Sequence, residues 1–298
     1  MGTVTRVGIS GWRYPRWRGT FYPVGLPQRD ELGYAAARLG TIELNGSFYS
    51  LQRPSSYQQW AAQTPEDFVL AVKGGRFVTH LKKLVDVQVP LANFFASGVL
   101  ALGRRLGPVL WQLPPTLPYD PDRLAAFFAL LPRTTARAAE LAAQHDARLD
   151  GRAWTTTDAD RPLHHALEVR GAGYVEPGFV ELLRAHDIAL VVADSAGRWP
   201  QLFDVTSDVV YVRLHGHAEL YASGYPRTLL EEWAARVRAW SAGETDVGGP
   251  LVASHAPRAP HGREVYVYFD NDAKVHAPFD AMSLAAMLRD GPPGAAAQ

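Results

Sequence analysis

The sequence has 298 residues, of which 47% are hydrophobic, which provides a core for one large α/β domain or two medium ones. Its formal net charge is zero, so it has no overall attraction to nucleic acid or anionic membranes. The absence of cysteine excludes disulfides, zinc–thiolate sites, iron–sulfur ligation and thiol nucleophiles. We find no signal-peptide pattern at the start and no apolar run near the ~20 residues of a membrane helix, so we expect a cytoplasmic protein without a membrane partner.

In chain order, short runs of β-branched and aromatic residues predict eight strands, at residues 6–10, 41–45, 68–73, 108–112, 166–170, 188–194, 209–215 and 265–269. Between them, helical patterns predict helices at 28–39, 55–63, 91–106, 121–131, 177–186, 228–240 and 280–289, with a short one at 199–203. Asp120 followed by Pro121 is typical of an N-cap with proline at the first helical position.

Regular alternation of strands and helices predicts right-handed βαβ units and a parallel sheet. Eight repeats in about 290 residues indicate the α/β class and a TIM-type (β/α)8 barrel, as a single domain over residues 1–290 with a disordered tail at 291–298. We expect an extra alanine-rich helix and loop at 133–162, before strand 5, and a long mobile loop at 241–263, before strand 8. The alternative is an open doubly wound sheet, but no Gly-x-Gly-x-x-Gly turn follows the first strand.

Strand periodicity predicts where the polar residues point, because side chains alternate between the two faces of a strand. The face under the helices must be apolar, so the polar residues near the strand ends are assigned to the barrel interior. These residues are Glu43, Asn45, Lys73, Gln112, Glu168, Arg170, Asp194, Arg213 and His215. Barrel active sites lie at this carboxyl end of the strands.

Isolated charges in a dry core are costly, so the interior carboxylates and cations are expected to pair. One interpretation is a self-compensating ion-pair network. The other is a site in which Glu43 or Glu168 is a general base and His215 transfers a proton. The predicted substrate-binding residues are Trp12, Arg13, Asn45, Lys73, Gln112, Arg170, Asp194, Arg213, Asn271 and Asp272.

We predict no cofactor and assign no metal ligands. A divalent metal held by Glu43, Glu168, Asp194 and His215 is the alternative, although no His-x-x-x-His spacing supports it. The leading hypothesis is an enzyme that acts on a small anionic or polyhydroxy substrate. A ligand-binding protein without turnover is another alternative, because a fold does not determine a function. The oligomeric state is left open.

The loops after strands 1 and 3 are rich in arginine, lysine and aromatic residues, and both leave the mouth end of the barrel. This rim favours phosphate, carboxylate or stacked rings, so nucleic-acid binding or processing is a second functional hypothesis. The residues that would contact the nucleic acid are Arg13, Arg16, Arg18, Arg76, Lys82 and Lys83. Phe21 and Tyr22, farther from the strand end, are expected to form a small satellite core.

A series of motifs occurs in fixed order along nearly the whole chain: Gly8-Ile-Ser-Gly-Trp, Trp17-Arg-Gly-Thr-Phe-Tyr-Pro, Glu43-Leu-Asn-Gly-Ser-Phe-Tyr, Thr64-Pro-Glu-Asp-Phe, Ala71-Val-Lys, Gln112-Leu-Pro-Pro, Glu168-Val-Arg, Val212-Arg-Leu-His-Gly and Tyr268-Phe-Asp-Asn-Asp. In these motifs the chain resembles the YecE-like barrel family, domain of unknown function 72 (DUF72).

The resemblance implies a TIM-type barrel and supplies no established reaction. Trp12, Asn271 and Asp272 fall at motif positions, as do most of the interior residues. The chain departs from the family pattern twice. Gly171 stands where the family usually has histidine, and Asp270-Asn271 stands where it usually has Asn-Asn.

Overall fold

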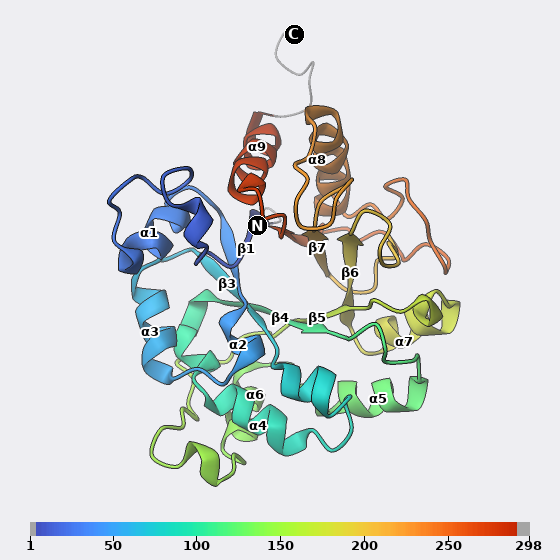
Figure 1. Ribbon diagram of the computed structural model, residues 1–298. Helices are drawn as coiled ribbons and strands as arrows, with labels where there is room; N and C mark the ends of the chain where they lie inside the picture. Colours follow the sequence, from blue (N-terminus) through green and yellow to red (C-terminus); the bar gives the residue numbers. More distant parts are fainter. Residues whose placement is uncertain (1–3, 291–298) are drawn as a thin grey trace.

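The computed structural model describes residues 4–290, which contain a closed eight-stranded barrel (Figure 1). Every strand pairs in parallel with its neighbours in chain order, and β8 closes the ring against β1. The strands are β1 Thr5–Ser10, β2 Thr41–Leu44, β3 Val69–Lys73, β4 Leu106–Gln112, β5 His165–Glu168, β6 Ile188–Asp194, β7 Val209–Leu214 and β8 Glu264–Phe269. The predicted TIM-type fold is confirmed.

Helices surround this barrel and cover its outer face (Figure 1), except for the short α2, which lies at the carboxyl end of β2. They are α1 Glu31–Ala36, α2 Gly46–Tyr49, α3 Pro54–Ala62, α4 Gln88–Ala96, α5 Pro121–Leu130, α6 Thr135–Ala142, α7 Pro177–Ala185, α8 Arg227–Ser241 and α9 His276–Asp290. The N-cap prediction is confirmed, because the Asp120 carboxylate accepts the backbone N–H of Arg123 at 3.0 Å. Among the described residues, no helix is long and apolar enough to cross a membrane.

Two helix predictions were wrong. The predicted helix at 91–106 ends at Ala96, because Gly98 has a φ of 119° and an irregular 3₁₀ segment follows. Residues 199–203 form no helix. This segment is too short to offset the cost of helix nucleation, and Phe203 instead lies buried, stacked on Trp233 and Trp240 of α8.

The two predicted insertions are present. Helix α6 begins at Thr135 in the first, and the second is a long irregular segment between α8 and β8. The buried Asp204 carboxylate ties the second one down by accepting the backbone N–H groups of Val252 and Ala253 at 3.1 and 3.0 Å. The predicted disordered tail lies outside the described residues.

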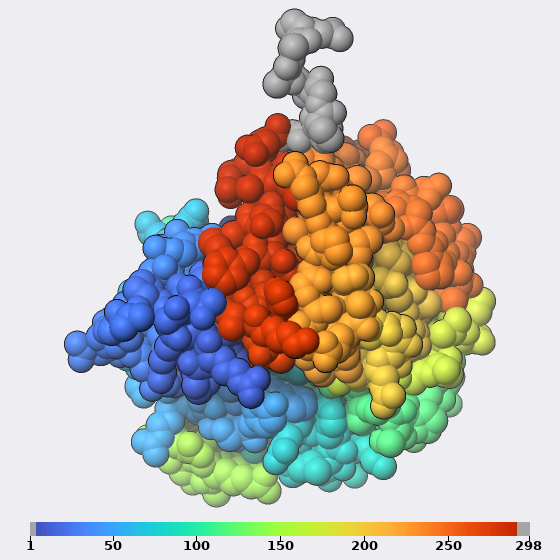
Figure 2. Space-filling view, turned by 45° about the horizontal axis from the view of Figure 1, so that its top comes forward, coloured from blue at the N-terminus to red at the C-terminus, as the bar shows by residue number. Residues whose placement is uncertain are grey.

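The first and last segments of the described chain pack together beside the barrel. Figure 2 shows the N-terminal segments in blue next to α9 in red. Phe21, in the loop after β1, packs edge-on against Phe279 of α9, with ring centroids 6.1 Å apart. Phe21 and Tyr22 are both buried, as predicted for a satellite core.

The inside of the barrel is a narrow apolar column that ends in polar groups. Ala71, Ala166, Ala193 and Tyr211 belong to one buried interior cluster, separate from the larger cluster beneath the helices. The Tyr211 hydroxyl marks the end of this cluster nearest the carboxyl ends of the strands. It donates a hydrogen bond to the Glu43 carboxylate at 2.6 Å. The carboxyl ends of the strands therefore carry the charged side chains inward above this column.

Candidate functional site

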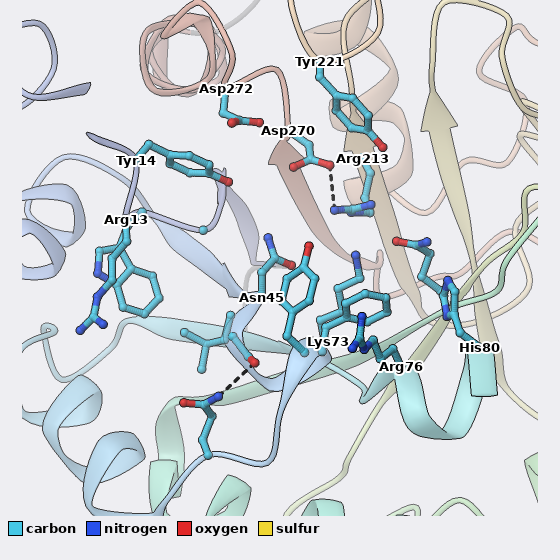
Figure 3. A pocket seen from close by; sticks show the side chains of 18 of the residues that line it. Arg13, Tyr14, Asn45, Lys73, Arg76, His80, Arg213, Tyr221, Asp270 and Asp272 are labelled. Carbon is cyan, nitrogen blue, oxygen red and sulfur yellow. Dashed lines mark hydrogen bonds and ion pairs between the residues drawn. The ribbon is translucent and has the colours of Figure 1, made fainter. Parts of the chain in front are cut away.

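A cavity of about 990 Å³ opens at the carboxyl ends of the strands (Figure 3). Its wall combines cations, two aspartates and several aromatic rings, contributed mainly by the segments that follow β1, β2, β3 and β8. Cavities of this size accept small-molecule ligands.

At the floor of the cavity, one guanidinium contacts carboxylates from three parts of the barrel. Arg213, on β7, is 1% exposed. Its Nε and Nη2 donate to Glu43 at 3.1 and 2.9 Å, and its Nη1 donates to Glu168 at 2.6 Å. Nη2 also donates to Asp270 at 3.1 Å. All three guanidinium nitrogens are thus engaged by protein acceptors.

His215 extends this network and is fully buried. Its Nδ1 lies 2.9 Å from Asp270 Oδ2, and its Nε2 lies 3.6 Å from Glu168 Oε1. Trp199 and Tyr221 pack edge-on against its ring, with centroids 5.5 Å away in both cases. The histidine therefore bridges two carboxylates behind the cavity wall.

The network keeps the carboxylates of Glu168 and Asp270 ionised. Burial alone would raise the pKa of Glu168, but the charges of Arg213 and Arg170 outweigh it and hold that pKa well below its usual range. Burial is likewise outweighed at Asp270, whose pKa is lowered by Arg213 and by its hydrogen bond to His215. A carboxylate with so low a pKa is a weak base near neutral pH.

Other titratable groups face the cavity itself. Lys73 ends β3, and burial, followed by the charge of Arg213, lowers its pKa to about 8. Asp272 is half-buried, and burial together with the charge of Asp270 raises its pKa to about 6. His80 lies beyond the end of β3, and burial and the charge of Lys73 lower its pKa. Lys73 and Asp272 therefore titrate closer to neutral pH than Glu168 and Asp270 do.

The predicted site residues divide into three groups. Those on the cavity wall are Trp12, Arg13, Asn45, Lys73, Gln112, Arg170, Arg213 and Asp272. Glu43, Glu168 and His215 form the buried layer under that wall. Asp194 and Asn271 lie elsewhere, and their predicted places in the mouth were wrong.

Asp194 points away from the barrel interior. The strand register places Ala193 level with the inward Arg213, and Asp194 level with Leu214, which belongs to the cluster beneath the helices. Strand β6 is apolar on both faces before this residue, so its sequence carried no alternation from which to choose a face. Burial raises the pKa of Asp194, and a hydrogen bond with Tyr225 partly opposes the rise.

Asn271 is held against α9 outside the cavity. Its Nδ2 donates to the Ser223 carbonyl at 2.9 Å and to Asp280 Oδ2 at 2.8 Å. The inward residue is its neighbour Asp270, which was missing from the predicted set. Continuing the alternation of Tyr266 and Tyr268 by one step past the strand end identifies Asp270.

Tyr14, His80 and Tyr221 also line the cavity and were not predicted. Tyr14 and Tyr221 lie in irregular segments and His80 lies in a π-helix at Phe77–Leu81, where strand periodicity gives no direction. Tyr14 is fixed by donating its hydroxyl to the Ser10 carbonyl at 2.5 Å.

The aromatic and basic rim is only partly available to a ligand. Trp12 lines the cavity and packs edge-on against Trp60, with centroids 5.6 Å apart. Arg18 is used internally, because its Nε donates to the buried Glu31 at 2.7 Å. Tyr49 is 67% exposed beside the cavity.

Within residues 4–290, no group of three or more histidine, aspartate or glutamate side chains is placed to hold one metal ion. The four ligands suggested by the sequence do not converge, because Asp194 faces outward and Arg213 lies between Glu43 and Glu168.

Sequence and structure comparisons agree on one family. The model of "Protein of unknown function DUF72" matches residues 6–297. The UPF0759 proteins YecE of Escherichia coli strain K12 and YunF of Bacillus subtilis strain 168 are each 26% identical, over 125 and 120 residues. These stretches cover 42% and 37% of this chain but only 42% and 39% of the relatives, so they span less than half of either relative's length.

Solved structures with the same fold cover almost the whole chain. A DUF72 family protein of Thermotoga maritima is 23% identical with a TM-score of 0.70, over 96% of this chain and 99% of that one. A DUF72 family protein of Enterococcus faecalis is 15% identical with a TM-score of 0.67, over 96% of each chain. The chain therefore belongs to the DUF72 family of proteins of unknown function.

Proposed function

We propose that this protein is an enzyme that uses general acid/base chemistry on a small anionic substrate in the barrel-mouth cavity. One observation carries the proposal: Lys73 is 8% exposed and lines the cavity, yet no carboxylate in the described chain lies within the 4.0 Å of an ion pair with its ammonium. Buried ammonium groups are normally paired. An anionic group of a substrate would supply the missing partner.

The surroundings of Lys73 support an anion. Arg170 lies on the same wall, its Nε on Glu168 at 3.0 Å and its guanidinium stacked 3.7 Å from the Trp199 ring centroid. Arg13 and Arg76 also line the cavity, and among residues 4–290 neither forms an ion pair within 4.0 Å. Arginine side chains of this kind favour carboxylate or phosphate.

Polar uncharged groups on the wall support a hydroxyl-bearing substrate. Asn45 donates to Ser10 Oγ at 2.8 Å, but its buried Oδ1 has no hydrogen-bond partner within the described chain. A buried acceptor without a partner is costly, so a ligand hydroxyl donating to it would be stabilising. Gln112 lies on the same wall and provides a further donor and acceptor.

In this proposal the proton transfers belong to groups on the wall. Asp272, with a pKa of about 6, is poised as the acid or base near neutral pH. Glu43, Glu168 and His215, for which direct roles were predicted, instead hold Arg213 and Asp270 in place and set the charge beneath the substrate. The reason is that their polar atoms are already engaged and the pKa of Glu168 is low.

Sulfate binding tests the anion site, measured by calorimetry. We expect Lys73→Met to weaken binding by about 10- to 100-fold, the ~1.5–3 kcal/mol of one charge-assisted hydrogen bond. Lys82→Met is the matched control, because Lys82 is exposed and outside the cavity wall. Equal sulfate affinity in all three proteins would contradict the proposal.

Catalysis is tested by following carbon-bound protons of small carboxylates and phosphate esters in deuterated water by NMR. Exchange or turnover that disappears in Asp272→Asn supports the enzyme. Binding of these anions without exchange or turnover would favour the non-catalytic alternative.

The nucleic-acid alternative retains one supporting observation, the exposed Tyr49 with the Arg76 guanidinium 6.0 Å from its ring centroid. A short single-stranded oligonucleotide at low salt discriminates. Binding that falls steeply with salt and is lost in Tyr49→Ala would favour this alternative over a small substrate.

A further inference from the structure

We propose that Lys73 is an amine nucleophile that forms an imine with the carbonyl carbon of an anionic substrate. The inference rests on the proposed function and names its substrate class: a small aldehyde or ketone that carries a carboxylate or phosphate. The argument starts from the position of the amine, because Lys73 lies on the cavity wall at the carboxyl end of β3.

The Lys73 amine has no ion-pair partner among the described residues because the nearby carboxylates pair with Arg213. Glu43, Glu168 and Asp270 all influence the amine electrostatically, but each is hydrogen-bonded to the guanidinium. What Lys73 contacts instead is the Phe48 ring, whose centroid lies 4.5 Å from Nζ. In the view of Figure 3 the lysine lies in the middle of the cavity, directly below Arg213.

This environment increases the reactive form of the amine. Burial and the neighbouring guanidinium lower the pKa of Lys73 from 10.5 to about 8. The neutral amine fraction at pH 7 rises roughly 300-fold, to about a tenth of the molecules. A desolvated lysine beside another cation is a recognised way to activate an amine for reaction with carbonyl groups.

His80, which could carry a proton, packs against the same Phe48 ring as Lys73. The His80 ring packs edge-on against Phe48 with centroids 5.1 Å apart, and its Nδ1 is 2.9 Å from the Thr79 hydroxyl. Burial and the charge of Lys73 lower the pKa of His80, so the imidazole is mainly neutral at pH 7 and can accept a proton. Tyr221 lines the cavity with its phenol protonated, because burial raises its pKa.

The reaction balances without a further reagent. The neutral amine lone pair attacks the carbonyl carbon, the C=O π pair moves to oxygen, and one N–H proton is transferred to that oxygen through His80 or solvent. The resulting carbinolamine loses its hydroxyl as water, with the second N–H proton, and a C=N bond forms. The anionic group of the substrate would pair with the ammonium form of Lys73 on entry, and Arg170 and Arg76 on the cavity wall would hold it once the neutral amine has attacked.

The chain provides its own controls, because it contains four lysines, at positions 73, 82, 83 and 274, and the other three are exposed. The experiment treats the full-length protein with pyruvate or glycolaldehyde phosphate and sodium cyanoborohydride, followed by peptide mass spectrometry. Among the lysines we expect one adduct, on Lys73, with a mass gain equal to the carbonyl compound less one oxygen atom; the α-amino group, whose ordinary pKa is also about 8, is scored separately. Lys73→Arg should abolish it.

A second measurement follows the rate at which acetic anhydride modifies each lysine as pH is raised. We expect Lys73 to show a midpoint near its pKa of about 8, below those of the three exposed lysines. A Lys73 midpoint equal to theirs would overturn the inference.

The outcomes separate this inference from the proposed function. Adducts on the exposed lysines but not on Lys73, with sulfate binding still dependent on Lys73, would overturn the imine and leave the anion site standing. Absence of both the Lys73 adduct and that sulfate dependence would overturn both proposals.

Discussion

Replacing Arg213 with methionine is expected to destabilise the fold severely, because Arg213 is the cation that all three carboxylates of the network share. The guanidinium makes four hydrogen bonds to three carboxylates, and Arg213 and Glu43 are at most 1% exposed. Removing one partner of a buried ion pair leaves uncompensated charge and costs about 3–5 kcal/mol. We expect a loss of ~4 kcal/mol in the free energy of unfolding at pH 7.

The loss should shrink as pH falls. In the wild type, the depressed pKa values of Glu168 and Asp270 contribute stability above their unfolded values near 4, and this is lost as pH falls through the folded values. In the variant, burial without the guanidinium would raise those pKa values above 4. The variant would then bind protons on folding and gain stability from pH 7 to pH 5.

The assay is urea unfolding followed by circular dichroism at both pH values. Arg137→Met is the control, because it removes an ion pair to Glu140 between side chains that are 71% and 62% exposed. We expect the control to match the wild type. A loss below about 1 kcal/mol for Arg213→Met at pH 7, or a gap that widens at pH 5, would refute the assignment of Arg213 as the stabilising centre.

Three further predictions concern single groups. In the wild type, sulfate binding should weaken as pH rises through about 6, because ionised Asp272 adds negative charge to the cavity; calorimetry on Asp272→Asn should show a smaller decline. Gly74→Ala should cost about 1–3 kcal/mol in urea unfolding, since its Cβ would lie 2.2 Å from the Trp111 ring, whereas at Gly75 the nearest atom is 3.7 Å away and alanine should be tolerated. Asp204→Ala should accelerate proteolysis at 250–255, and an unchanged cleavage rate would show that its bonds to Val252 and Ala253 do not hold this segment.

Alternation along the strands predicted most of the inward residues because one face of each strand had to be apolar. Glu43 and Arg213 alternate with buried aliphatic residues, so their direction followed from the sequence. Asp194 could not be placed in this way, because its whole strand is apolar and only the pairing register with β7 determines its face.

Depth within the site was not predictable from periodicity. Glu168 and Lys73 are the last residues of their strands, and both side chains point inward. Glu168 is buried under Arg213 and Arg170, whereas Lys73 lines the cavity. Which carboxylates pair with a given cation depends on how far along the barrel axis each side chain lies. That position is set by the stagger between neighbouring strands. Residues between the strands, such as His80 in its π-helix and Tyr221 in a turn, depend on backbone paths that strand periodicity does not describe.

Arg213 lies late in the chain, and this has a consequence for how the protein folds while it is being synthesised. Glu43 and Glu168 lie on β2 and β5, whereas Arg213 arrives on β7 and Asp270 only after β8. A nascent chain that ends before β7 would have to enclose Glu43 and Glu168 without the guanidinium that they share. Fragments that end before β7 should therefore stay open and protease-sensitive, and ring closure should await release of the C-terminal strands from the ribosome.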